Sequence, residues 1–102
     1  MFKQQQRKRI RPSDTIPLRL NARERHLIDE KTFAPEELTA RLVRNKGEDP
    51  VCRFTLDELD ELAGYVAAEA NHAKDKKLKK ELDRIFALID DLLGRYTDDE
   101  ED

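Results

Sequence analysis

The sequence predicts a mostly helical α+β domain, in which a small two-stranded sheet and two short helices come before a C-terminal antiparallel helical hairpin. Apolar residues alternate along one short segment, as in a half-buried strand, and recur every three or four residues along others, as in amphipathic helices. The chain has 102 residues, which suits one domain with one core. Because 42% of the residues are charged and 37% are hydrophobic, we expect a small core beneath a densely charged surface.

The alternating segment, residues 15–20, predicts the first strand. Its apolar residues fall on one face: Ile16, Leu18 and Leu20. Pro17 has no amide hydrogen to give to a neighbouring strand, so one side of this strand is expected to be an edge. Residues 51–54 predict the second strand of the same sheet.

Two short helices are predicted between the strands. Asn21 suits an N-cap, and Glu24 stands three residues later, where it can close a capping box, so a helix is expected from there to about Lys31. Pro35 suits the first turn of the second helix. The apolar face of that second helix consists of residues four apart, namely Ala34, Leu38 and Leu42. Residues 45–50 have the composition of a loop.

The stretch VCRFTLDEL, residues 51–59, predicts the start of a long helix. Thr55 and Glu58 have the spacing of a capping box, and Phe54 and Leu59 have that of a hydrophobic staple. The helix carries an apolar stripe made of Leu59, Ala63, Val66, Ala70 and Ala73.

A second apolar stripe follows, made of Leu78, Leu82, Ile85, Ile89, Leu92 and Tyr96. The step from Ala73 to Leu78 would rotate the stripe by roughly 140° on one straight helix. A turn at residues 71–75 avoids this and predicts the hairpin. The alternative is one long C-terminal helix that dimerises as a coiled coil. Two observations favour that alternative: lysines 76, 77, 79 and 80 oppose the dipole of a helix starting there, and no Gly or Pro marks the break.

The two ends of the chain carry opposite charge. Residues 1–12 contain five basic residues and no acidic residue, and residues 98–102 are all acidic, while the formal net charge of the chain is −3. Neither end has the apolar residues that would offset the entropy of ordering it. We therefore expect a disordered basic arm at 1–13, a globular domain at 14–97 and a disordered acidic tail at 98–102.

The sequence predicts a soluble cytoplasmic protein. Its one cysteine, Cys52, cannot form an internal disulfide. Its longest apolar stretch, residues 85–89, is too short to cross a bilayer, and the first residues lack the apolar run of a secretory signal.

No catalytic, metal or cofactor site is expected. The only serine, Ser13, has no histidine or acid placed to activate it, and Cys52 stands in an apolar strand where a thiol is inert. Glu69, His72 and Asp75 are spaced by three, but the second Glu-x-x-His that a carboxylate-bridged site needs is missing. We expect no enzyme and no small-molecule substrate.

Interaction with another macromolecule remains as the expected function. The first hypothesis is a protein-interaction module, with a homodimer as one form, in which part of the last apolar face is left for another chain: Phe86, Leu92, Leu93 and Tyr96. The competing interpretation is that the rest of the domain covers this face.

The alternative hypothesis is a nucleic-acid-binding accessory protein. Its phosphate contacts, or contacts to an acidic partner, would come from the basic arm and from a ridge on the last helix: Arg7, Lys8, Arg9, Arg11, Lys76, Lys80 and Arg84. A solvated helix face is the competing interpretation of the ridge, because Lys77 and Lys79 can form ordinary ion pairs with acids four residues on.

Overall fold

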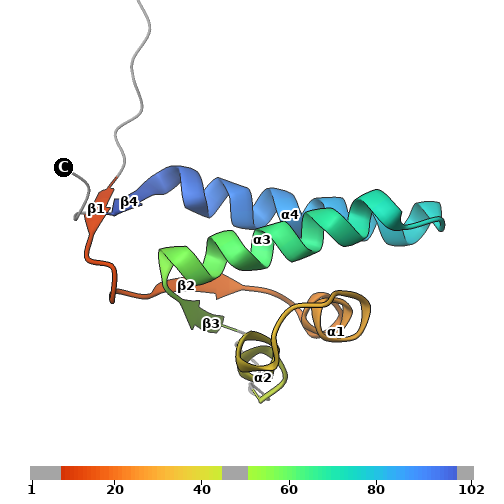
Figure 1. The fold of residues 1–102 in the computed structure, drawn as a ribbon, viewed down its shortest axis with the longest axis horizontal. Coiled ribbons are helices and arrows are strands. Elements are labelled where there is room, and N and C mark those ends of the chain that lie inside the picture. The colour runs from red at the N-terminus through yellow and green to blue at the C-terminus, as the bar shows by residue number, and fades with distance from the viewer. Residues whose placement is uncertain (1–7, 45–50, 99–102) are drawn as a thin grey trace, which may run out of the picture.

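A computed structural model describes residues 8–44 and 51–98. Within these residues the protein is a mostly helical α+β fold, as the sequence predicts, with four helices and two small sheets. Figure 1 shows the two long helices side by side, with one sheet and the two short helices below them.

The predicted sheet forms between β2 (Ile16–Arg19) and β3 (Val51–Phe54), which pair antiparallel. Ile16 lies opposite Phe54 and Leu18 lies opposite Cys52, and all four side chains are buried. The alternation read from the sequence therefore places one face of this sheet in the core.

Both short helices form, but Ala34 and Pro35, which were expected on the face and in the first turn of the second helix, lie just before its first residue. Helix α1 (Ala22–Lys31) begins with the reciprocal capping box of Asn21 and Glu24. Helix α2 (Glu36–Arg44) follows Pro35, and its Leu38 and Leu42 are buried.

The two long helices are α3 (Leu56–His72) and α4 (Lys76–Arg95). Thr55 and Glu58 form the predicted capping box at the start of α3. Ala73 and Asp75 have extended backbone conformations, and α4 then runs back along α3 (Figure 1). The sides that face each other are fully buried at Leu59, Val66 and Ile85. This turn replaces the straight continuation that would have split the apolar stripe over two faces.

A second sheet was not predicted. Strands β1 (Lys8–Ile10) and β4 (Tyr96–Asp98) pair in parallel, with Lys8 opposite Tyr96 and Ile10 opposite Asp98. Residues 8–10 were expected in a disordered arm, but Ile10 packs against the core, and this apolar contact helps to fix the strand. The expectations for residues 1–7 and 99–102 lie outside the described residues.

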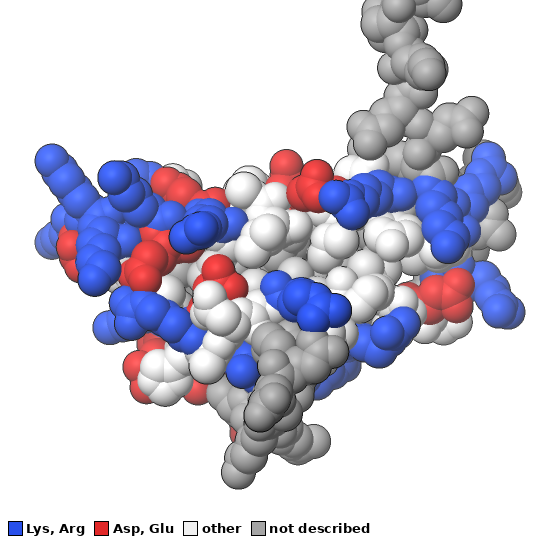
Figure 2. Space-filling model, turned by 180° about the vertical axis from the view of Figure 1, so that it is seen from behind, with Lys and Arg blue, Asp and Glu red and all other residues white. Residues whose placement is uncertain are grey.

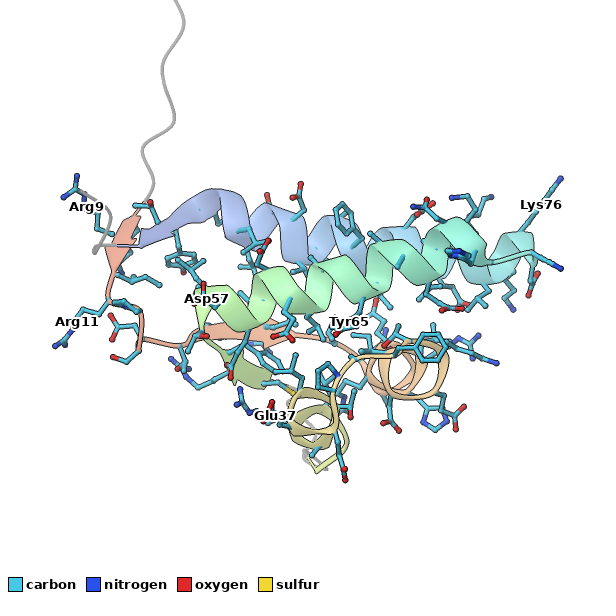
Figure 3. All side chains as sticks on the ribbon, viewed as in Figure 1. Arg9, Arg11, Glu37, Asp57, Tyr65 and Lys76 are labelled. Atoms are coloured by element: carbon cyan, nitrogen blue, oxygen red, sulfur yellow. The ribbon has the colours of Figure 1, made fainter. Side chains whose placement is uncertain are left out.

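The molecule therefore has two distinct ends. The strand end consists of β1, β4, the start of α3 and the end of α4, and the turn end consists of residues 73–80. Figure 3 shows Arg9, Arg11 and Asp57 at the strand end and Lys76 at the turn end. Among residues 8–44 and 51–98, no helix combines the length and apolar character that crossing a bilayer requires.

Candidate interaction surfaces at the strand end

The strand end carries an open hollow between α3 and α4, which we call the acidic hollow. It has a volume of about 510 Å³. Its walls come from the start of α3, the end of α4 and β4: Leu56, Asp57, Asp60, Asp90, Leu93, Gly94, Tyr96 and Thr97. The lining therefore holds three carboxylates and no basic side chain.

Helical spacing explains how these groups come together. Asp57 and Asp60 are three residues apart on α3, and Asp90 and Leu93 are three apart on α4, so each pair shares one flank of its helix. Tyr96 ends α4 and opens β4 at the same place.

The lining of the acidic hollow includes three apolar side chains. Leu56, Leu93 and Tyr96 pack against the core, but each stays partly exposed. Partly exposed apolar side chains beside three carboxylates offer burial to an apolar group and charge complementarity to a basic one.

An anchored helix start holds one wall of this hollow. Thr55 donates its amide hydrogen to Glu58 Oε1 at 2.9 Å, and the Glu58 amide donates to Thr55 Oγ1 at 3.2 Å. Glu58 also accepts two hydrogen bonds from Arg41 of α2, both at 2.7 Å. Arg41 thereby joins α2 to the first turn of α3, the turn that carries Leu56 and Asp57.

The ion pair with Arg41 makes the Glu58 carboxyl more acidic. Hydrogen bonding from the guanidinium is the largest influence, and it holds the pKa of the Glu58 carboxyl below its ordinary value of 4.5. Arg41 also lies over the Phe54 ring, with its guanidinium carbon 5.3 Å from the ring centroid. The start of α3 is therefore tied to both α2 and β3.

A second hollow, which we call the basic hollow, lies beside β1. It has a volume of about 500 Å³. Its walls come from β1, the linker to β2, the sheet and β4: Lys8, Arg9, Ile10, Asp14, Thr15, Ile16, Pro17, Arg53 and Tyr96. Three basic side chains thus face one carboxylate, and that carboxylate already accepts the Arg11 amide hydrogen at 3.0 Å.

Tertiary structure adds Arg53 to the basic arm. Its Nε donates to Thr15 Oγ1 at 3.0 Å, which holds the side chain on the β1 side of the sheet. Arg53 was not predicted as a contact, because it lies 42 positions from Arg11 in the sequence. Tyr96 lines both hollows, so the acidic and basic surfaces meet at one side chain.

The four predicted interface residues are divided by the structure. Leu93 and Tyr96 line the acidic hollow, and Phe86 stands seven residues before Leu93 on the same flank of α4. Leu92 is turned by roughly 100° from Leu93, toward the other flank. All four are partly buried against the core, so the domain covers part of this face and leaves part open.

The predicted nucleic-acid contacts are divided as well. Lys8, Arg9 and Arg11 lie at the strand end, Lys76 and Lys80 lie at the turn end, and Arg84 stands one turn further along α4. These six side chains are exposed, and Arg7 lies outside the described residues. On the face that Figure 2 shows, Lys and Arg side chains gather toward both ends, and the surface between them is mostly uncharged with isolated basic and acidic side chains. The structure therefore does not join them into one basic face.

Sequence reasoning also missed the aspartates of the acidic hollow. Asp57, Asp60 and Asp90 were not selected as candidate site residues. The available signal was the three-residue spacing of Asp57 and Asp60 beside Leu56. The most exposed large apolar side chain in the described ranges, Phe33 at 87% exposure, was not selected either.

No metal centre emerges in the described part of the chain, where no group of three or more His, Cys, Asp or Glu side chains is placed to hold an ion. Compared with known proteins, the chain matches no family model, no curated protein and no solved structure.

Proposed function

We propose that the protein is a non-catalytic interaction module that binds a protein partner through the acidic hollow. One observation carries the proposal: Leu56, Leu93 and Tyr96 stay partly exposed in an open hollow whose lining also holds three carboxylates. Apolar surface beside carboxylates gains most from a partner that inserts an apolar side chain and brings cations to the rim.

The chemistry of the lining supports a binding role over a catalytic one. The acidic hollow contains no histidine, cysteine or serine. The only thiol, that of Cys52, is buried and donates to the Arg41 carbonyl oxygen at 3.6 Å. A cytoplasmic location belongs to the same proposal, since this single buried thiol has no partner cysteine in the chain.

Peptide selection tests the proposal without a known partner. A random peptide library displayed on phage is selected against the folded full chain. We expect enrichment of peptides that combine Lys or Arg with an apolar side chain, and we expect these peptides to lose at least tenfold in affinity for Leu93→Asp. The matched control is Leu88→Asp, because Leu88 is 41% exposed on α4 and does not line the hollow.

Two outcomes of this selection count against the proposal. One is that no peptide is enriched. The other is that the enriched peptides bind Leu93→Asp as tightly as they bind the unmodified chain. Circular dichroism of both variants establishes that each is folded.

A nucleic-acid-binding function is the second candidate, and a specific observation favours it. Arg53 joins Lys8 and Arg9 around one hollow, which raises the local positive charge beyond that of the arm alone. Such a site would bind phosphates with an affinity that falls as salt rises. Fluorescence anisotropy of a labelled single-stranded RNA at two salt concentrations tests it, and Lys8→Glu with Arg53→Glu should reduce the salt dependence together with the affinity.

A further inference from the structure

We propose that the partner of the acidic hollow is a second copy of this chain, joined to the first by a two-fold axis near Tyr96, so that the acidic hollow of each copy faces the basic hollow of the other. This inference rests on the proposed function, because it names the occupant of the same hollow. It also gives the basic hollow a role in protein binding.

Charge complementarity selects this occupant. The acidic hollow has three carboxylates and no cation, while the basic hollow has Lys8, Arg9 and Arg53 against one carboxylate. Two copies of either hollow would repel each other. One hollow of each kind attracts, so the charged surfaces of a single chain are matched to each other.

The adjacency of the hollows fits two-fold symmetry. In a symmetric dimer the same surface is used by both copies, so each part of it must be complementary to another part of itself. Tyr96 lines both hollows, so they adjoin each other at the strand end. A rotation of 180° about an axis near Tyr96 then brings two acidic-to-basic contacts together at once.

Apolar groups stand at the right places to add to the charge contacts. Leu56 and Leu93 lie on the acidic side, Ile10 lies on the basic side, and Tyr96 lies between them. These side chains are only partly buried in the single chain. In the dimer their exposed surface meets across the axis, and this central apolar region is surrounded by the charged rims.

Charge reversal on each side tests the dimer. Asp60→Lys with Asp90→Lys reverses the acidic hollow away from the first turn of α3, where a cation would also oppose the helix dipole. Lys8→Glu with Arg53→Glu reverses the basic hollow. The matched control is Lys76→Glu with Lys80→Glu, which makes the same change of charge as the second variant at the turn end.

Sedimentation equilibrium over a concentration series provides the readout. We expect the unmodified chain and the turn-end control to approach twice the chain mass at low salt. The unmodified chain should return toward the single mass in about 1 M salt, where the screening length is about 3 Å. Each reversed variant alone should keep the single mass, and an equimolar mixture of the two should form a mixed dimer because their charges are complementary again.

Several results would overturn the proposal. A single mass for the unmodified chain at every concentration in low salt is the first. Dimerisation of either reversed variant alone is the second, and failure of the mixture to associate when both variants are folded by circular dichroism is the third. The salt response of the unmodified chain needs no substitution, so it tests the proposal even where a variant does not fold.

The outcomes separate this inference from the proposed function. If the chain stays single while selected peptides bind the acidic hollow, the interaction module stands and its partner is another protein. If Lys8→Glu with Arg53→Glu abolishes RNA binding by a chain that stays single, the basic hollow belongs to nucleic acid. If no peptide is enriched in the selection, the proposed function itself is refuted.

Discussion

Helices α3 and α4 start at opposite ends of the molecule, and they start in different ways. The start of α3 has a reciprocal capping box, and Arg41 holds Glu58 from a neighbouring helix. The start of α4 has one cap contact, in which Asp75 Oδ1 accepts the Lys77 amide hydrogen at 3.2 Å, and its first turn contains no acidic residue. The first turn of α3 is thus held by a charged contact from a neighbouring helix as well as by its cap, while the N-cap contact of α4 is local.

The charged side chains at the two ends also have different surroundings. At the turn end, Lys79 pairs with Asp83 of the next turn at 3.4 Å, and both side chains are about half exposed. Such pairs are worth a few tenths of a kcal/mol and leave the helix face solvated. At the strand end, three aspartates line the same hollow as partly exposed apolar side chains. Charge beside exposed apolar surface favours docking more than charge alone does.

The largest expected effect concerns the packing that joins the two ends. Ile89→Ala should lower the free energy of unfolding by about 2–5 kcal/mol, because Ile89 is fully buried and its removal leaves a cavity. The neighbouring Leu88→Ala should cost less than about 1 kcal/mol, since Leu88 is 41% exposed. Urea unfolding of both variants measures the difference. Equal costs would mean that α4 does not pack along one face.

The next effect compares two capping boxes, that of α3, which also pairs with Arg41, and that of α1. Glu58→Gln keeps a side-chain acceptor for the Thr55 amide but removes the charged pair with Arg41, so we expect a loss of about 1–2 kcal/mol after allowing for partial exposure. Glu24→Gln is the matched change in the capping box of α1. It should cost only a few tenths of a kcal/mol. Urea unfolding should show that Glu58→Gln is less stable than Glu24→Gln, and equal stabilities would contradict the role of Arg41.

Acid should weaken the strand end through the same carboxyl. The pKa of Glu58 is lowered in the folded state by Arg41, so its contribution is fully present above the ordinary value of 4.5. That contribution is lost as the pH falls below 4.5 toward the lowered pKa. The stability gap between the unmodified chain and Glu58→Gln should therefore narrow from neutral pH to about pH 3. A gap that stays constant over this range would contradict the assignment.

The smallest expected effect concerns the turn end, where we expect a substitution to raise the free energy of unfolding. Lys76→Glu places an acid at the first position of α4, where the helix dipole favours negative charge. We expect the free energy of unfolding to rise by about 0.3–1 kcal/mol at low ionic strength. Thermal unfolding in low and high salt measures it. A decrease in stability would show that Lys76 has a tertiary role.

Local signals in the sequence account for most of the fold. Both capping boxes were predicted from residues three apart, and the β2–β3 sheet from alternation over a few residues. The four lysines at the start of α4 argued for one uninterrupted helix, whereas the structure places a turn before them. Asp75 as N-cap offsets part of that unfavourable charge.

The strand end could not be predicted in the same way. Strands β1 and β4 have three residues each, and their paired residues lie 88 positions apart in the sequence. Neither strand therefore carries a sequence pattern that identifies its partner. The two hollows depend on this pairing, because Tyr96 reaches both of them from β4. The acidic hollow also needs Asp57 and Asp90 from separate helices, and that juxtaposition is visible only once α3 and α4 are packed.

Self-association through the strand end, and not through the turn end, is tested without any substitution by backbone amide NMR spectra of the full chain at increasing protein concentration. We expect the amide signals of Lys8, Arg53, Asp57 and Leu93 to shift progressively, and those of Lys76 and Lys80 to stay unchanged. Shifts confined to the turn end, or spectra that stay the same at every concentration, would contradict it.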